Sequence, residues 1–415
     1  EENAEKLAQA SEHYRVKPYF YALLGGVDQE ALVRKLTDFA VDTAKVTHCE
    51  AVEKELLGKK LPFLKIYTNY PKAVPLIAQE LQEQGIKSYE KDILFVHRYL
   101  RDNKIIPMSL TEAAGEYLTE PKEQGGQSER MRIPIFLAKT VVQNNSSVLL
   151  NWNILAFDIE TYALKKEINS FKNPILMISF YGKNFQKVIT WKKFNHQLDY
   201  LEVVADEAEL IKRFKEVILE QQPEILTGYY SDGFDFPYLL ARAEKYHISL
   251  DLGMDYSELT VRHNDAKIKG IAHLDVFKFI KNIFGKNLKS ESFSLDAVSQ
   301  ELLNHQKHKV NLDKLAYVWD NEPDKLVTFC EYNLHDSRLT YQLCEKLLPD
   351  MIEFTGIIGL PTFDLIRLSF SRLVENYILK RAIEYNVIAP NKPDNEEVSQ
   401  RMEESIQGAF VYEPT

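Results

Sequence analysis

LAFDIET at residues 155–161 decides the fold, because an apolar strand here ends in two alternating acids. Residues i and i+2 of a strand point to the same face, so we expect Asp158 and Glu160 to face one point. Hard divalent cations prefer carboxylate oxygens, and the pair therefore outlines a metal site. On this segment alone, two solvated acids at a strand end are an equally good interpretation.

A second acidic motif lies at the start of a predicted helix. The stretch ILTGYYSDGFDFPYLL at residues 225–240 runs from an apolar strand through a turn into a helix. That helix is predicted to begin near Pro237, where proline is tolerated. Asp235 stands at its mouth, and a capping role alone would also explain this residue.

A third acidic motif lies inside a helix-patterned run from about Asp324 to Leu348. Its segment YNLHD places Tyr332 and Asp336 one turn apart on a shared face. Taken alone, Tyr332 is better interpreted as a packed helical tyrosine. His335 is about 100° away from Asp336 around the helix, so we interpret it as a structural or surface residue.

Taken in order, the three segments resemble the D-x-E, N-x-x-x-F-D and Y-x-x-x-D motifs of the proofreading 3′–5′ exonuclease domain of family B DNA polymerases. The archaeal members are the most similar, and the resemblance covers nearly the whole chain. It implies an α/β, ribonuclease-H-like exonuclease domain, with a mixed sheet flanked by helices, and a smaller α+β N-terminal domain. Further similar stretches lie at residues 19–24, 95–108, 294–303, 367–375, 389–393 and 408–414.

The resemblance also implies a set of metal ligands. Asp158, Glu160, Asp235 and Asp336 would bind two divalent ions, Mg²⁺ or Mn²⁺, with Asp158 bridging both. Two such ions about 3.5–4 Å apart activate water and stabilise the charges of phosphodiester hydrolysis. Tyr332 would orient the attacking water or contact the scissile phosphate.

One position departs from the family pattern. Tyr230 stands where the family usually has an asparagine that helps to hold the single-stranded primer end. A tyrosine here would either stack on a base, which contributes about 1–3 kcal/mol per base, or obstruct the strand. Phe234 of the same segment is a second candidate for contact with DNA.

Composition is consistent with a soluble globular protein: 45% of residues are hydrophobic and 27% are charged. The net charge of −10 argues, taken alone, against nucleic-acid binding. Residues 261–290, however, carry seven basic residues against two acidic ones, a local charge of +5. This stretch would serve phosphate contacts or form a solvated face. The basic residues are Arg262, Lys267, Lys269, Lys278, Lys281, Lys286 and Lys289.

The three cysteines are odd in number and widely spaced, which argues against a disulfide framework. No apolar run approaches the roughly 20 residues that span a bilayer. We therefore expect no membrane partner and a cytoplasmic, nucleoid-associated location.

Four parts are predicted along the chain. These are an N-terminal domain at 1–150 with a flexible connection near 109–147, an exonuclease domain at 151–349, a helical return to the N-terminal domain at 350–395, and the start of a linker to a palm domain at 396–415. Within the exonuclease part, strands are predicted at 154–159, 175–181, 188–191 and 225–229.

The motifs D-x-x-S-L-Y-P, K-x-x-x-N-S-x-Y-G and Y-x-D-T-D, which carry nucleotidyl transfer in this family, do not occur in residues 1–415. We therefore expect this chain alone not to synthesise DNA. The resemblance implies metal-dependent hydrolysis at single-stranded DNA 3′ ends and on primer–template DNA. It implies as partners a polymerase portion, in the same longer chain or a separate subunit, and a sliding clamp.

Two alternatives stay open. The chain would serve mainly as a DNA-binding and assembly subunit of a split polymerase if Tyr230 weakens hydrolysis. The other alternative is an RNA-directed nuclease of the same fold.

Overall fold

The computed structural model forms two compact units, Glu1–Asp102 with Ile378–Thr415, and Asn103–Tyr377. The second unit includes residues 103–150, which the sequence analysis assigns to the N-terminal domain. The stretch at 408–414 and most of the expected linker lie outside the described residues. The described residues are 17–25, 29–36, 39–117, 133–144, 150–163, 169–285, 288–290, 292–305, 310–393 and 398–400.

The first unit is an antiparallel sheet of five strands in the order β2-β3-β4-β1-β5. Strand β1 shows why helices cover it: Phe20 and Ala22 pack in one apolar cluster with α2 and α3, while Tyr19 and Tyr21 belong to a cluster on the other face. The elements are β1 (Tyr19–Leu23), α2 (Gln29–Leu36), β2 (Ala40–Val41), β3 (Ala44–Leu56), β4 (Lys59–Thr68), α3 (Ala73–Glu83), β5 (Ser88–Tyr89) and α4 (Phe95–Asp102).

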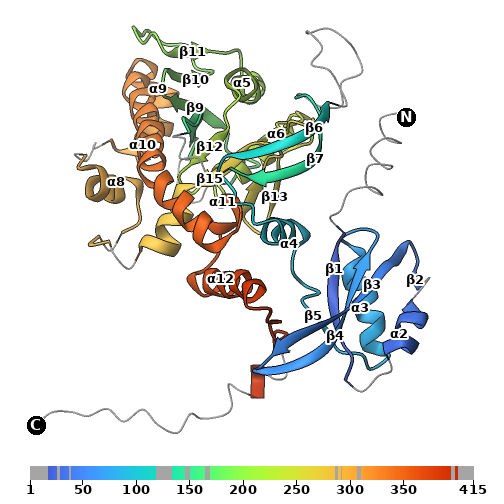
Figure 1. Cartoon of the computed structure of the whole chain (residues 1–415). Helices are drawn as coiled ribbons and strands as arrows, with labels where there is room; N and C mark the ends of the chain where they lie inside the picture. The colour runs from blue at the N-terminus through green and yellow to red at the C-terminus, as the bar shows by residue number, and fades with distance from the viewer. Residues whose placement is uncertain are drawn as a thin grey trace, which may run out of the picture. The chain divides into compact units, whose positions relative to one another are not determined.

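The second unit is organised around a mixed sheet of six strands in the order β11-β10-β9-β8-β12-β15 (Figure 1). Strand β9 pairs antiparallel with β8 and β10, while the other three pairs are parallel. The prediction of a mixed sheet flanked by helices is confirmed. The strands are β8 (Ile154–Thr161), β9 (Ile175–Gly182), β10 (Phe185–Thr190), β11 (Leu201–Val203), β12 (Ile225–Gly228) and β15 (Ala272–Asp275).

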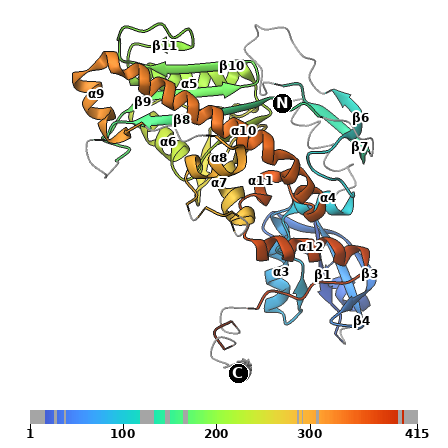
Figure 2. The same cartoon turned by 90° about the vertical axis from the view of Figure 1, so that its left-hand side faces the viewer.

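Helices cover both faces of this sheet. Helix α10 lies across β8 and β9 on one face, with α5 on the other (Figure 2). Among the described helices, none is long and apolar enough to cross a bilayer. The helices are α5 (Glu207–Gln221), α6 (Asp235–Lys245), α7 (Val276–Phe279) with a π-helix at Ile280–Phe284, α8 (Leu295–Leu303), α9 (Leu315–Asn321) between 3-10 turns at Leu312–Lys314 and Pro323–Lys325, α10 (Leu326–Ile358), α11 (Thr362–Leu365) and α12 (Phe370–Glu384), which extends past the boundary at Tyr377.

The alternation of side chains along β8 places its two acids on one face of the sheet. Leu155, Phe157 and Ile159 pack in the apolar cluster that contains α5 and α6. Ile154 and Ala156 pack in the cluster that contains α10. Successive strand residues point to opposite faces, so the even-numbered residues Asp158 and Glu160 continue the series that faces α10.

The predicted end of the third motif's helix near Leu348 is wrong. Helix α10 does not end near Leu348 but passes through Pro349 and ends at Ile358, where it is capped by Gly359, whose φ of 78° suits glycine. Proline inside a helix costs about 3 kcal/mol, and burial of Leu347, Leu348 and Met351 beside it offsets that cost. The stretch predicted as a helical return, 350–395, contains the end of α10 together with α11 and α12 among its described residues.

The flexible connection predicted near 109–147 contains two paired strands among its described residues. Strands β6 (Thr111–Tyr117) and β7 (Phe136–Gln143) pair as an antiparallel hairpin. Gly115 permits a close approach of the two backbones, since a Cβ there would lie 2.0 Å from the carbonyl oxygen of Leu137. The polar composition of residues 109–147 gives no indication of this pairing. A second hairpin joins β13 (Thr260–Arg262) to β14 (Asp265–Lys267).

Candidate functional site

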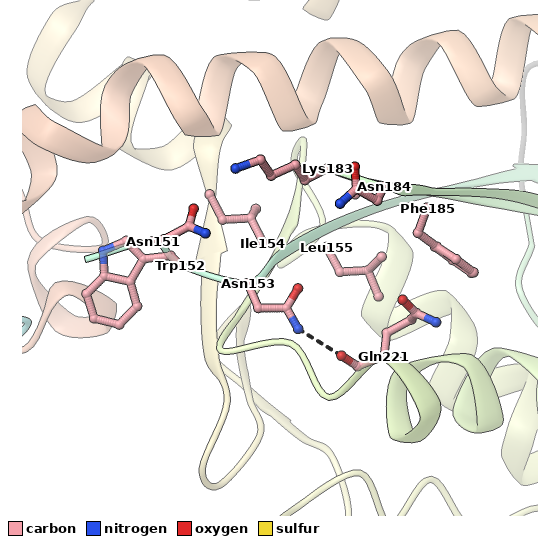
Figure 3. A pocket seen from close by; sticks show the side chains of 10 residues that line it. Asn151, Trp152, Asn153, Ile154, Leu155, Lys183, Asn184, Phe185 and Gln221 are labelled. Atoms are coloured by element: carbon pink, nitrogen blue, oxygen red, sulfur yellow. Dashed lines mark hydrogen bonds between the residues drawn. The ribbon is translucent and has the colours of Figure 1, made fainter. Parts of the chain in front are cut away.

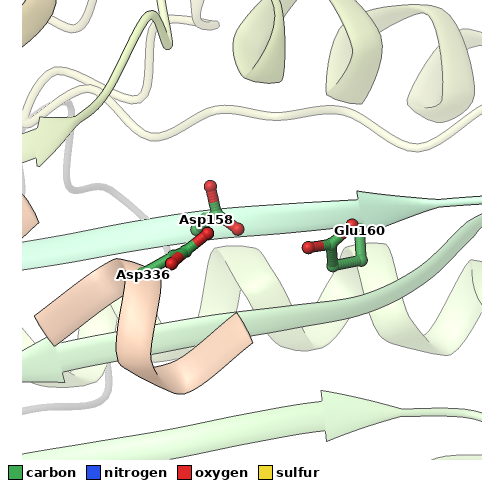
Figure 4. A group of neighbouring side chains, drawn as sticks. All are labelled: Asp158, Glu160 and Asp336. Carbon is green, nitrogen blue, oxygen red and sulfur yellow. The ribbon is translucent and has the colours of Figure 1, made fainter. Parts of the chain in front are cut away.

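Three predicted acids come together where α10 crosses β8. Asp158, Glu160 and Asp336 each offer an oxygen atom within 4.8 Å of the others. Figure 4 shows Asp336 reaching from its helix toward the strand that carries the other two. All three residues are partly buried. Oδ1 of Asp336 is inaccessible to solvent and has no hydrogen-bond partner among the described residues.

Asp235 belongs to the same neighbourhood but not to this group of three. It is the first residue of α6 and is almost fully buried, with 3% of its surface exposed. Its charge is among those that raise the pKa values of Asp158 and Glu160, so it lies close to both. The four residues Asp158, Glu160, Asp235 and Asp336 are called the acid site below.

Burial raises the pKa of every carboxyl group in the acid site. It raises the pKa of Glu160 to about 8, with further contributions from the charges of Asp336 and Asp235. It raises the pKa values of Asp235 and Asp336 to about 7. The pKa of Asp158 is raised well above its ordinary value by burial and by the three other acids, although a hydrogen bond from Asn333 opposes this rise.

Among the described residues, no lysine, arginine or histidine forms an ion pair with these acids. Buried like charges without a counter-charge are unfavourable. Full ionisation of the acid site near neutral pH is therefore unfavourable without a cation, and a cation from solution would favour it.

Tyr332 lies one helical turn before Asp336 and faces it. Burial raises the pKa of this phenol, and the charges of Asp336 and Glu160 raise it further. The hydroxyl group in turn lowers the pKa of Asp336, against the larger effect of burial. Tyr332 therefore stays a neutral hydrogen-bond donor at the edge of the acid site.

Tyr230 lies in the loop between β12 and α6 and is 47% exposed. Its φ of 65° is in the left-handed region, which is uncommon for a bulky residue. The ring meets that of Phe277 edge to face, with centroids 5.0 Å apart. It also covers Gly233, where a Cβ atom would lie 2.4 Å from the ring carbon Cζ.

Phe234 is placed differently from Tyr230. It precedes α6, is partly buried against the apolar cluster of that helix, and contacts the ring of Tyr238 at a centroid distance of 5.4 Å. His335 is partly buried, and its ring lies 6.2 Å from that of His305.

The loop that carries Tyr230 is held by a buried acid that sequence reasoning missed. Asp275 ends β15, and its carboxylate accepts hydrogen bonds from the backbone N–H groups of Tyr230 (2.9 Å) and Asp232 (3.1 Å). The sequence does contain a signal for Asp275, because this acid comes at the end of a mainly apolar strand, as Asp158 does.

Asp232 of the same loop is fully buried and is matched by cations. Lys278 Nζ and Arg367 Nη2 each lie 2.9 Å from its Oδ2. His273 lies 3.4 Å away through Nδ1. Asp232, Lys278 and Arg367 are called the cation-matched cluster below. Lys278 belongs to the basic stretch at 261–290, so part of that charge is used inside the protein.

Asn333 is a second residue that sequence reasoning missed. It is fully buried on α10, and its Nδ2 donates a hydrogen bond of 2.7 Å to Oδ2 of Asp158. No motif marks an amide next to Tyr332, and the two partners are 175 residues apart in the chain.

A cavity of about 240 Å³ lies elsewhere on the same strand, at the beginning of β8 (Figure 3). The turn between β9 and β10 forms one side, and the amide of Asn153 donates to the carbonyl of Gln221 at its floor. None of the acids lines this cavity. Its lining residues are Asn151, Trp152, Asn153, Ile154, Leu155, Gly182, Lys183, Asn184, Phe185 and Gln221.

Comparison with known proteins identifies the family. The model of "DNA polymerase family B, exonuclease domain" matches residues 86–298, slightly more than half of the chain. The chain belongs to DNA polymerase family B. This confirms the family predicted from the three acidic motifs.

Archaeal members of family B are similar over the full sequence. The DNA polymerase of Pyrococcus glycovorans is 34% identical across 100% of this chain and 48% of its own length. DNA polymerase 1 of Pyrococcus abyssi is 34% identical across 96% of this chain and 47% of its own length. The chain thus spans about half the length of these relatives.

A solved structure of family B has the same fold. The DNA polymerase of the hyperthermophilic archaeon Pyrobaculum calidifontis superposes with a TM-score of 0.76 at 23% identity. The match covers 92% of this chain and 47% of that one.

Proposed function

We propose that this chain hydrolyses DNA from the 3′ end in a metal-dependent reaction, as the proofreading half of a family B DNA polymerase. Residues 151–349 would carry the reaction. The substrate would be a single-stranded 3′ end, or a primer end separated from its template. The polymerase portion would lie in the same longer chain or in a separate subunit.

The acid site fits a pair of hard divalent ions, Mg²⁺ or Mn²⁺. Its donors are all carboxylate oxygens, the ligands that such ions prefer. Three of them converge within 4.8 Å without a cation from the described residues. This convergence of uncompensated carboxylates is the single observation that supports the proposal most strongly.

Each acid has a distinct place in the proposal. Asp158 would be the shared ligand, because it lies between Glu160 on its own strand and Asp336 on α10. Asp235 would complete the set from the first turn of α6. When bound, the ions would lower the pKa of a water molecule and stabilise charge on the phosphoryl oxygens.

The surrounding residues would orient the reactants. Tyr332, neutral and hydrogen-bonding, would hold the attacking water or a phosphoryl oxygen beside Asp336. Tyr230, with its exposed ring, would stack on a base near the 3′ end. Phe234 would contribute mainly through the position of α6, because its ring packs against the apolar cluster.

The test is release of deoxynucleoside monophosphates from a 5′-labelled single-stranded oligodeoxynucleotide. We expect a ladder that shortens from the 3′ end with Mg²⁺ or Mn²⁺ and no product in excess EDTA. Vigorous hydrolysis in EDTA would contradict the metal-dependent proposal. An RNA oligonucleotide of the same sequence serves as the second substrate, and faster hydrolysis of RNA would favour an RNA-directed nuclease.

A further inference from the structure

Helix α10 must lie in one register on the sheet for the acid site to form. Helix α10 supplies Asp336, whereas β8 supplies Asp158 and Glu160. The two elements are far apart in the sequence, so no short loop fixes the position of α10 along the strand. A slide of one residue along the helix axis moves Asp336 by about 1.5 Å. Most contacts of α10 with the sheet are apolar and non-directional, so they do not by themselves define the register sharply.

Three fully buried polar residues lie at the same level as the acids: Ser179, Asn333 and Ser337. Ser179 stands on β9 directly opposite Asp158 in the β8–β9 ladder. Its hydroxyl donates to the backbone carbonyl of Asn333 at 2.7 Å and lies 2.6 Å from the hydroxyl of Ser337. The hydroxyl of Ser337 also donates to the backbone carbonyl of Ser179 at 3.3 Å.

These hydrogen bonds are reciprocal between strand and helix. Ser337 is one turn beyond Asn333, so the two present a carbonyl and a hydroxyl to the same serine of β9. A slide of α10 in either direction would separate the partners and leave buried hydroxyl groups unpaired, which is unfavourable. These hydrogen bonds therefore specify the register of α10 on the sheet at Ser337, the residue that follows Asp336.

The side chain of Asn333 extends this arrangement to Asp158. Nδ2 of Asn333 donates a hydrogen bond of 2.7 Å to Oδ2 of Asp158, an arrangement that suits an ionised carboxylate, which can only accept hydrogen bonds. Oδ1 of Asn333 is buried and has no hydrogen-bond partner among the described residues. Within the described residues, the side-chain hydrogen bonding of this amide is thus directed to Asp158 alone.

We propose that Ser179, Asn333 and Ser337 form a polar latch that builds the metal site by fixing both the register of α10 and the orientation of Asp158. The proposal rests on the proposed function, since it assumes that the acid site binds divalent ions. The three residues are positioning residues: they touch the ligands or their helix, not the substrate.

Mn²⁺ affinity tests the latch without reference to hydrolysis. Free Mn²⁺ is measured by electron paramagnetic resonance in the full chain, at one pH, for the wild type, for Ser179→Ala with Ser337→Ala, and for Asn333→Leu. Loss of groups that orient ligands typically weakens metal binding by about 10- to 100-fold, and we expect at least about tenfold for each variant. The urea midpoint without metal should change little in the double serine variant, because both hydroxyl partners are removed together. Asn333→Leu leaves Oδ2 of Asp158 without its donor and should lower the midpoint.

Thr190→Val is the matched control. Thr190 is fully buried on β10 of the same sheet, and its hydroxyl donates 2.8 Å to the carbonyl of Leu176. The substitution removes a comparable buried hydrogen bond that does not involve β8, and the variant should keep the wild-type Mn²⁺ affinity.

The outcomes separate the two proposals. Absence of Mn²⁺ binding by the wild type would overturn the proposed function. Binding by the wild type with equal affinity in the latch variants would overturn the latch alone. An equal loss in Thr190→Val would also overturn it, because any buried hydrogen bond would then suffice. If the double alanine variant does not fold, Asn333→Leu decides by the same comparison.

Discussion

Asp232 lies in the loop before α6 and Asp235 is the first residue of that helix. Both are buried, yet their carboxyl groups behave in opposite ways. The pKa of Asp232 is held below its ordinary range, because the hydrogen bond with His273 and the charge of Arg367 outweigh burial. The pKa of Asp235 is raised to about 7, because burial dominates there. Burial is common to both residues, so the cations make the difference.

The contrast separates two uses of a buried carboxylate. In the cation-matched cluster, Lys278 and Arg367 satisfy Asp232 from within the unit, and the loop is fixed to the segment after α11. In the acid site, the protein gathers four carboxylates and leaves their charge unmatched among the described residues. The first arrangement stabilises the fold, whereas the second stores an unfavourable charge that a metal from solution can neutralise.

The largest expected effect is on hydrolysis, from Asp158→Ala. This variant removes the proposed shared ligand and should lower the rate at least about 10³-fold, since each 1.36 kcal/mol of lost transition-state stabilisation is tenfold. Folding should hardly change, because relief of carboxylate repulsion offsets the lost hydrogen bond with Asn333. Single-turnover hydrolysis and urea unfolding on the same preparation measure both. A near-normal rate in material free of contaminating nuclease would place the metal site elsewhere.

The next effect is on stability, from Asp232→Ala. Removal of one partner of a buried ion pair leaves the others uncompensated and typically costs about 3–5 kcal/mol. We expect a loss of this size in the free energy of unfolding, measured in urea without metal. The matched variant is Asp235→Asn, which removes an unmatched acid and should leave the stability unchanged or higher. Equal destabilisation by both variants would break the comparison between the two regions.

A smaller effect concerns pH. Between about pH 4, the ordinary carboxyl value, and the raised pKa values of about 7 to 8, the folded state holds protons that the unfolded state has released. The stability that these protons provide is present at low pH and is lost as the pH rises through 7 and 8. Asp232 acts in the opposite sense, because its lowered pKa contributes stability that is lost only in acid.

Thermal unfolding of the metal-free chain between pH 6 and pH 9 measures this loss. The midpoint should fall as the pH rises, and excess Mg²⁺ should restore it most at the alkaline end. Asp235→Asn, with one raised group fewer, should show a shallower decline. A midpoint independent of pH and of Mg²⁺ would show that the acid site is not under electrostatic strain.

The smallest effect is expected from Tyr230→Asn, in the loop that links the two regions. Loss of one stacking ring should raise KM for single-stranded DNA by about tenfold, within the 1–3 kcal/mol typical of base stacking. The rate at saturating DNA should stay the same, since the acids are untouched. A large gain in hydrolysis would instead show that Tyr230 obstructs the strand, and would favour a DNA-binding and assembly role for the chain.

Sequence reasoning located the acids because local periodicity determines where their side chains point. Alternation in LAFDIET and the one-turn spacing of Tyr332 and Asp336 require no tertiary information. The predicted strands agree with β8, β9, β10 and β12 to within a few residues. The site residues themselves remain predictions until their variants are measured.

The contacts that organise these acids could not be predicted in the same way. Asn333 meets Asp158 across 175 positions of the sequence, and Arg367 meets Asp232 across 135. Such pairs depend on how α10 and the segment after α11 pack on the sheet. The end of α10 could not be predicted for a related reason. Proline usually ends a helix, but tertiary packing of the buried residues around Pro349 stabilises α10 beyond it.

The ring of Tyr230 over Gly233 also constrains how this loop can have changed over its history. A side chain at 233 and a ring at 230 cannot occupy the same space, because the first atom added at 233 would lie 2.4 Å from the ring. A residue larger than glycine at 233 is compatible with this loop only if the exposed ring of Tyr230 moves away. The two positions are therefore sterically coupled, and homologous sequences should be compared at both together.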